Sequence, residues 1–215
     1  MHNRSYRQKK IATLLLLITV LPFLYPAALN SASGDNASGK IFDGKSLNGW
    51  EGDQKLWRVE DGVLIGETTT PLKQTTYLIW RQGTVDDFEL TVSYRITRGN
   101  SGIQYRSQDL GDFRVTGYQA DLESGKNHSG ILYEQGGRGI VTKRGERITL
   151  NEAGGKEHGQ PVGTSKNLQS VIKSEDWNQY RIIARGNHLQ HFINGLLMSE
   201  TTDNEKEKQL SLIHI

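Results

Sequence analysis

Three polar side chains in the segment 117–123 have the types and the spacing that sugar chemistry requires. If this segment is a β-strand, alternation along the strand points Gln119, Asp121 and Glu123 to one face and their apolar neighbours to the other. Carboxylates act as general acids and bases, and amides hold hydroxyl groups. The pattern therefore predicts the floor of a sugar-processing cleft, although the solvated face of a half-exposed strand would show the same alternation.

A second strand-like segment, 100–106, carries further candidate binding residues. Asn100, Gln104 and Arg106 would share one face of it, and Arg106 could bind sugar oxygens, although a strand arginine also commonly forms a surface salt bridge. The glycine-rich run 136–139 follows an apolar segment but opens no helical pattern. It therefore predicts a turn that presents Arg138 rather than a phosphate-binding loop.

The elements that would position these side chains are predicted to be β-strands. Residues 88–96 alternate strictly between apolar and polar types. Asp61-Gly62 predicts a hairpin over residues 56–66, Asn194-Gly195 predicts another turn, and no window shows sustained helical periodicity. Strands separated by turn residues predict an all-β sandwich or jelly roll. The last apolar run, 210–215, begins and stops, which predicts a sandwich truncated at its C-terminal strand.

The first 33 residues predict a secretory signal peptide. Four basic residues precede an apolar run at 11–24, and small residues follow it. The run is short for a membrane span, although an uncleaved anchor remains a second interpretation. Residues 34–40 predict a flexible linker, and residues 41–215 a single domain. The mature domain is therefore expected in the periplasm or secreted, without stable membrane association.

Charge and composition exclude several classes of protein. Removing residues 1–33 takes away four of the 26 Lys+Arg and none of the 24 Asp+Glu, which leaves 22 against 24 and a formal charge of −2. The remainder has no basic cluster with interleaved aromatics, so we expect no nucleic-acid partner. The chain has no Cys, which excludes disulfides, thiolate zinc sites and a thiol nucleophile. The domain must therefore be stabilised by its own core.

A set of motifs occurs in a fixed order along the chain. These are FDGKSLNGW at 42–50, WRVEDGVL at 57–64, NSGIQYR at 100–106, GYQAD at 117–121, YE with GRG at 133–139, and WNQY with ING at 177–195. Over about residues 40–210 the chain resembles the 3-keto-disaccharide hydrolase domain family. The resemblance implies a concanavalin A-like jelly roll that acts on glycosides whose C3 hydroxyl has been oxidised to a ketone.

The resemblance also implies a reaction, since a C3 ketone acidifies the C2 proton. Abstraction of that proton, β-elimination of the C1 leaving group and rehydration would cleave the glycoside, and need a base together with a cationic or metallic group at the ketone oxygen. Asp121 is the first choice for the base, with Glu134 as its catalytic partner. One strand register puts Glu134 opposite Asp121, whereas a slip by one residue puts Tyr133 there and turns Glu134 to the other face.

The predicted substrate-binding residues are Asn100, Gln104, Arg106, Gln119, Glu123 and Arg138. Two further functions stay open at this stage. One is a non-catalytic carbohydrate-binding module on the same fold. The other is a retaining glycosidase, against which Gln119 argues, because an amide at the nucleophile position cannot attack as a carboxylate does. An oligosaccharide or glycoside is the expected partner in each case. A divalent metal could take part, but no local ligand motif identifies one.

Overall fold

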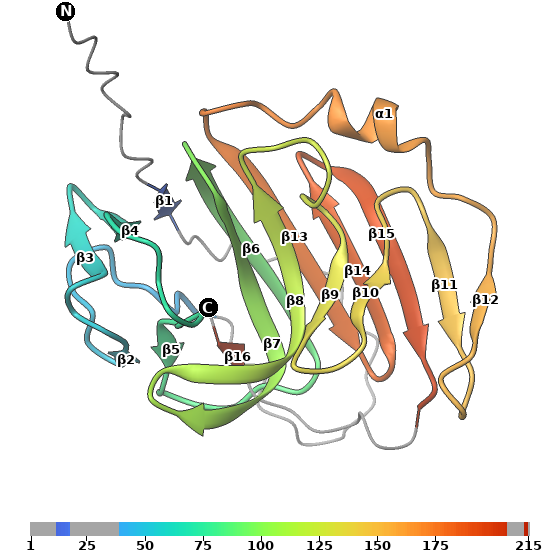
Figure 1. Cartoon of the computed structure of the whole chain (residues 1–215), viewed down its shortest axis with the longest axis horizontal. Coiled ribbons are helices and arrows are strands. Elements are labelled where there is room, and N and C mark those ends of the chain that lie inside the picture. The colour runs from blue at the N-terminus through green and yellow to red at the C-terminus, as the bar shows by residue number, and fades with distance from the viewer. Residues whose placement is uncertain (1–11, 18–38, 206–212, 215) are drawn as a thin grey trace, which may run out of the picture.

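The structure is a computed structural model that describes residues 12–17, 39–205 and 213–214 (Figure 1). Nearly all of its elements are strands, as the sequence predicts. The strands are β1 (Ala12–Leu17), β2 (Trp50–Glu51), β3 (Trp57–Glu60), β4 (Val63–Thr68), β5 (Ile79–Trp80), β6 (Phe88–Ile96), β7 (Asn100–Gly111), β8 (Arg114–Glu123), β9 (Leu132–Gln135), β10 (Gly139–Thr142), β11 (Arg147–Leu150), β12 (Lys156–His158), β13 (Asn178–Arg185), β14 (His188–Ile193), β15 (Leu196–Asp203) and β16 (Ile213–His214).

The strands form a β-sandwich of the jelly-roll type, which confirms the predicted fold class. The larger sheet has nine strands in the order β12-β11-β15-β14-β13-β6-β1-β4-β3, and the sheet that faces it has five in the order β10-β9-β8-β7-β16. β2 and β5 pair with each other in a separate two-stranded sheet. The facing surfaces of the nine-stranded and five-stranded sheets bury Tyr94 and Tyr180 from the former against Tyr105 and Tyr118 from the latter. Tyr105 Oη lies 2.8 Å from His191 Nε2, so a buried hydrogen bond also joins the two layers.

Local sequence explains the elements that were predicted correctly. The β3–β4 hairpin turns through Asp61 and Gly62, whose φ angles of 50° and 78° are those of a type I′ turn. Burial alternates along β6, as its side-chain pattern predicts. The one helix among the described residues, α1 (Ser165–Gln169), is capped by Thr164 and is too short to produce a helical period in the sequence.

Both ends of the described chain contribute strands. β1 lies inside the predicted signal peptide, and its backbone pairs with β4 and β6. β16 pairs with β7. The rest of the predicted leader and most of the last apolar run fall outside the described residues, so leader cleavage and C-terminal truncation stay predictions. No helix in the described ranges is long and apolar enough to cross a membrane.

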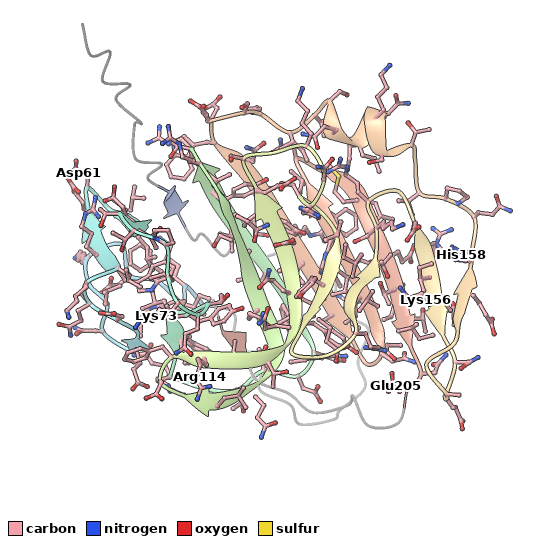
Figure 2. The ribbon with its side chains drawn as sticks, in the orientation of Figure 1. Asp61, Lys73, Arg114, Lys156, His158 and Glu205 are labelled. Atoms are coloured by element: carbon pink, nitrogen blue, oxygen red, sulfur yellow. The ribbon has the colours of Figure 1, made fainter. Side chains whose placement is uncertain are left out.

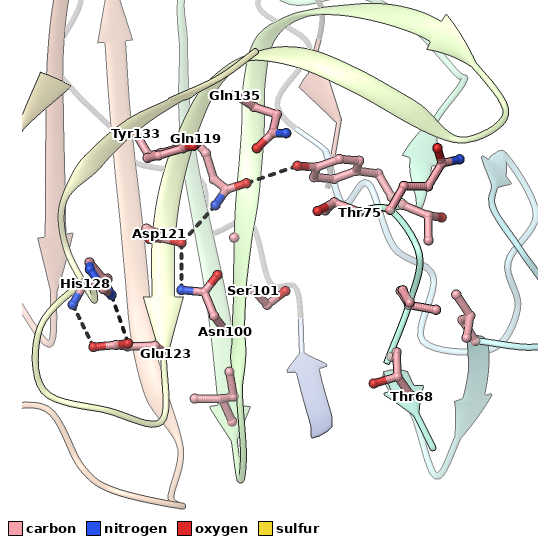
Figure 3. A pocket seen from close by; sticks show the side chains of 18 of the residues that line it. Thr68, Thr75, Asn100, Ser101, Gln119, Asp121, Glu123, His128, Tyr133 and Gln135 are labelled. Carbon is pink, nitrogen blue, oxygen red and sulfur yellow. Dashed lines mark hydrogen bonds and ion pairs between the residues drawn. The ribbon is translucent and has the colours of Figure 1, made fainter. Parts of the chain in front are cut away.

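The candidate site lies on the outer face of the five-stranded sheet. β8 turns Tyr118, Ala120 and Leu122 into the core, and all three are buried there. Gln119, Asp121 and Glu123 therefore point the other way, as alternation predicts. The segment containing β2 to β5 lies beside this face and forms the opposite wall (Figures 1 and 3).

Candidate active site

A cavity of about 900 Å³ lies between the five-stranded sheet and the segment that carries β4 and the loop 69–77. Its floor is formed by side chains from neighbouring strands, among them Asn100 on β7, Asp121 on β8 and Tyr133 on β9. Tyr77 and Lys73 line it from the facing segment. Figure 3 shows these strands and the facing loop on either side of the cavity. The volume suits a small saccharide.

Asp121 is a buried carboxylate held by neutral groups. It is 5% exposed, and its Oδ1 accepts hydrogen bonds from Gln119 Nε2 at 2.8 Å and from Asn100 Nδ2 at 3.2 Å. Burial raises the pKa of Asp121 to about 6, and these two bonds and the nearby His128 only partly oppose that effect. The carboxylate is therefore ionised at neutral pH but close to the pH at which it takes up a proton.

A chain of buried amides fixes the group that donates to Asp121. Ser107 Oγ donates to Gln104 Oε1 at 3.1 Å, and Gln104 Nε2 donates to Gln119 Oε1 at 2.9 Å. Tyr77 Oη also donates to Gln119 Oε1 at 3.3 Å, and burial raises the pKa of Tyr77 to about 12. With its oxygen engaged in this way, Gln119 must turn its amide nitrogen towards Asp121.

Gln104 itself was predicted to bind substrate, and the structure places it elsewhere. It is fully buried and does not line the cavity. It supports Gln119 from the neighbouring strand β7, and the two residues are paired and hydrogen-bonded. Gln119 crosses the backbone of Gly102, where a Cβ atom would lie 2.4 Å from Gln119 Cδ. A glycine at this position is therefore what allows Gln119 to lie flat on the floor of the cavity.

The prediction that Glu134 is the catalytic partner of Asp121 is wrong in this geometry. β8 and β9 pair Gln119 with Tyr133 and Tyr118 with Glu134. Tyr133 therefore shares the cavity face with Asp121, and Glu134 turns to the opposite face. The observed pairing is neither of the two predicted registers, since Tyr133 lies opposite Gln119 rather than opposite Asp121. It shares with the second register only that Tyr133 faces the site and Glu134 faces away, because the length of a loop does not fix the pairing of its strands.

Arg138 was predicted to bind substrate, and the structure instead makes it the centre of an ion cluster on that opposite face. Its Nε bonds to Glu134, its Nη2 lies 2.6 Å from Asp203 Oδ2, and its Nη1 lies 2.7 Å from Glu205 Oε2. A guanidinium shared by three carboxylates has little capacity left for a ligand.

Arg106 was also expected to face the substrate, and it does not line the cavity. Its φ of 47° lies in the left-handed region, and the β7–β8 register shifts between Tyr105 and Gln108. This bulge rotates Arg106 out of the alternation, and its guanidinium lies 3.7 Å from Asp87 instead. The lining cations are Lys73 and Arg98.

Glu123 lines the cavity as predicted, but its carboxylate is engaged by the loop that follows β8. Oε1 accepts from the backbone nitrogens of Asn127 at 2.5 Å and His128 at 2.7 Å, and Oε2 lies 3.1 Å from His128 Nδ1. His128 and Tyr77 are lining residues that sequence reasoning missed, whereas Tyr133 also lines the cavity and was named as the alternative to Glu134. The position of His128 in the sequence could have indicated a place at the site, since it closely follows the predicted site strand.

No group of three or more His, Cys, Asp or Glu side chains within residues 39–205 is arranged to hold a metal ion. Asp121, Glu123 and His128 all line the cavity, but Glu123 and His128 are bonded to each other.

Comparisons with known proteins agree with the fold and the motifs. Residues 37–212 match the family model of the 3-keto-alpha-glucoside-1,2-lyase-like domain. Among solved structures, the chain is similar to a crystal structure from Parabacteroides distasonis described as a candidate glycosyl hydrolase, with a TM-score of 0.50 and 19% identity over 79% of this chain and 73% of that one. At this identity the likeness supports the fold alone. No curated protein matches the chain. Because the family model covers most of the sequence, including every strand of the cavity floor, the protein belongs to the 3-keto-alpha-glucoside-1,2-lyase-like domain family.

Proposed function

We propose that this protein cleaves glycosides whose C3 hydroxyl has been oxidised to a ketone. Asp121 abstracts the C2 proton, the C1 substituent leaves by β-elimination, and addition of water to the resulting double bond completes the hydrolysis. The family supports a glycoside-processing role, and the arrangement around Asp121 supports this reaction.

The state of Asp121 is the observation that carries the proposal. A general base works best when its pKa lies near the working pH, and burial raises the pKa of Asp121 to about 6. Both amide hydrogen bonds end on Oδ1, so neither occupies Oδ2. That oxygen can take up a proton without displacing the amides that hold the side chain.

The lining cations provide the second requirement of the reaction. Removal of the C2 proton leaves negative charge on the ketone oxygen, and a nearby cation lowers the energy of that enolate. Lys73 and Arg98 line the cavity from two different segments. In this proposal they are the cations beside the substrate, in place of Arg106, which was predicted to bind sugar oxygens.

The geometry favours elimination over the double displacement of a retaining glycosidase. That mechanism needs two carboxyl groups about 5 to 5.5 Å apart that both face the sugar. Glu123 is engaged by the backbone and side chain of its own loop, and Glu134 faces away from the cavity. Asp121 is left as the carboxylate with a free oxygen.

The test is to incubate the protein with a 3-keto-disaccharide and with its unoxidised parent. We expect cleavage of the keto sugar alone, and a fall in turnover of about 10² to 10⁴ in Asp121→Asn with little change in folding. Asp61→Asn is the matched control, because Asp61 is exposed in the β3–β4 turn (Figure 2), where Asn suits the backbone equally well. Cleavage of the parent would contradict the proposal, and binding without turnover would indicate a carbohydrate-binding module.

We also propose that the domain acts outside the cytoplasm. The support is the basic residues and apolar run at the N-terminus together with the absence of Cys. Expression with fractionation is expected to find the processed chain in the periplasm or the medium. A full-length chain confined to the cytosol would contradict export.

A further inference from the structure

A histidine borders the same cavity as the candidate base. His128 lies in the loop 124–131 between β8 and β9, and its imidazole is 45% exposed. The imidazole is close enough to Asp121 for its charge to lower the pKa of that carboxyl. Figure 3 shows His128 beside Glu123 on the same side of the cavity as Asp121. Both groups therefore face the space that a bound sugar would occupy.

Glu123 holds this imidazole in a defined orientation. Its Oε2 lies 3.1 Å from His128 Nδ1, and its Oε1 accepts from the backbone of His128 and Asn127. Burial acts to raise the pKa of Glu123, but these backbone and side-chain hydrogen bonds lower it below the ordinary value. Glu123 is therefore anionic, favours a proton on Nδ1, and leaves Nε2 as the ring nitrogen available to a ligand.

The loop that carries His128 is itself fixed to the sandwich. Arg144 is 5% exposed, and its guanidinium donates to the backbone oxygens of Ser129 at 2.8 Å and Lys126 at 2.6 Å. The Oγ of Ser129 accepts from the backbone nitrogen of Glu123 at 2.9 Å. Contacts on both sides of His128 thus hold its backbone, which is the condition for a positioned catalytic group.

We propose that His128 is the general acid that protonates the leaving oxygen at C1, with Glu123 as its positioning residue. This proposal rests on the proposed function, which supplies the base but leaves the departing alkoxide without a proton donor. Two other lining groups near Asp121 fit the role less well. Tyr77 is a buried phenol bonded to Gln119, and Glu123 is anionic.

The proton and electron balance closes with these two groups. Asp121 takes the C2 proton, and the electron pair of that bond forms the enolate of the C3 ketone. The ketone re-forms as the C1–C2 double bond forms and the bond from C1 to the leaving oxygen breaks. That oxygen takes the departing electron pair and a proton from the imidazolium of His128. When water adds to C1 it returns a proton to the imidazole, and C2 takes back the proton held by Asp121.

The test compares a poor and a good leaving group in the full-length protein. Methyl 3-keto-glucoside releases an alkoxide that needs protonation, whereas para-nitrophenyl 3-keto-glucoside releases a stable phenolate. We expect His128→Gln to lower turnover of the methyl glycoside by about 10² to 10³ and of the nitrophenyl glycoside by less than about threefold. Equal losses on both substrates, or no loss on either, would overturn the assignment.

Deuterium exchange separates this proposal from the function on which it rests. In deuterated water, His128→Gln should still form the enolate, so the unreacted methyl substrate should gain deuterium at C2, as followed by NMR. Asp121→Asn should abolish that exchange. If the variant with His128 replaced exchanges no deuterium, His128 is not the acid. If the unaltered protein neither cleaves nor exchanges any keto glycoside, the proposed function itself fails, and the role of His128 fails with it.

The chain offers a closely matched control for the substitution. His188 Nε2 lies 2.7 Å from Glu200 Oε1, and the two side chains are 41% and 12% exposed, against 45% and 12% for His128 and Glu123. This second pair lies on β14 and β15 in the other sheet, and neither residue lines the cavity. His188→Gln should turn over both glycosides at the rate of the unaltered protein. A selective loss of turnover on the methyl glycoside in this variant would overturn the proposal.

Discussion

Two buried aspartates in this protein have similar exposure and opposite electrostatic environments. Asp121 is 5% exposed and Asp203 is 4% exposed. Asp121 is bonded to the amides of Gln119 and Asn100, whereas Asp203 Oδ2 lies 2.6 Å from Arg138 Nη2 and accepts from Tyr118 Oη at 2.5 Å. The pair therefore shows what neutral and cationic partners each do to a buried carboxylate.

The difference lies in the charge of the partners rather than in burial. Burial acts to raise the pKa of both carboxyls. At Asp203 the bonds from Arg138 and Tyr118 overcome that effect and lower the pKa, whereas at Asp121 two neutral amides do not, and the pKa rises to about 6. Asp203 thus joins β15 of the larger sheet to Arg138 beside the smaller one, and Asp121 remains able to exchange a proton.

The largest expected effect is that one substitution changes stability in opposite directions at the two sites. Because the folded pKa of Asp121 is raised from 3.8 to about 6, its ionised form costs up to about 3 kcal/mol above pH 6. Asp121→Asn should therefore raise the free energy of unfolding by about 1 to 3 kcal/mol at pH 8, and this gain should vanish below about pH 4. Urea titrations at the two pH values measure it.

Asp203→Asn should destabilise the protein over the same range. Its folded pKa is lowered, so its contribution is present above the ordinary pKa of 3.8 and lost as the pH falls. We expect a loss of about 1 to 3 kcal/mol at pH 8. The loss is limited because Arg138 retains its ion pairs with Glu134 and Glu205. If both substitutions shifted stability in the same direction, the contrast between the two sites would not hold.

The sequence was sufficient to predict the strand face on which this contrast depends. Alternation along β8 correctly placed Gln119 and Asp121 on the cavity side, because one face of the strand must cover an apolar core. The type I′ hairpin at Asp61 and the strand β6 were predicted for equally local reasons: turn chemistry and a period of two.

The missed features depend on contacts that no local pattern contains. Glu134 was misplaced because register is set by the whole sandwich, and Arg106 because a left-handed, non-glycine bulge interrupts an otherwise regular alternation. Tyr77 and His128 reach the cavity from loops. Their contribution depends on where those loops pack, and only the tertiary structure specifies that.

The second expected effect is on the pH dependence of activity. The base must be ionised to take up the C2 proton, and at a pKa of about 6 the ionised fraction of Asp121 falls about tenfold between pH 7 and pH 5. We therefore expect kcat/KM for a 3-keto-glycoside to fall about tenfold over that range. Circular dichroism at each pH checks that the fold persists. An acidic limb centred near pH 4 would indicate that Asp121 titrates like an exposed carboxyl, and the comparison with Asp203 would lose its basis.

The smallest expected effect comes from displacing the amide of Gln119 while leaving both Gln119 and Asp121 in the sequence. In Gly102→Ala the new Cβ would lie 2.4 Å from Gln119 Cδ, so the amide must move away from Asp121. Weakening one hydrogen bond to the ionised carboxylate should raise the pKa of Asp121 by up to about one unit. Activity should then fall about two- to fivefold at pH 6 and recover towards the unaltered rate at pH 9, where the carboxylate is again ionised.

The pH dependence of this loss distinguishes an electrostatic effect from a steric one, since Gly102 also lines the cavity. A methyl group that merely obstructs the substrate would lower kcat/KM by the same factor at every pH, and the amide chain would then have no part in setting the pKa of Asp121. Gly83→Ala is the control, because its nearest contact is a Trp80 ring atom at 3.3 Å and it does not line the cavity. If Gly102→Ala instead shifts the acidic limb of the pH profile to higher pH, the neutral amides set the working pKa of Asp121. A guanidinium such as Arg138 beside Asp203 would lower that pKa too far for a base.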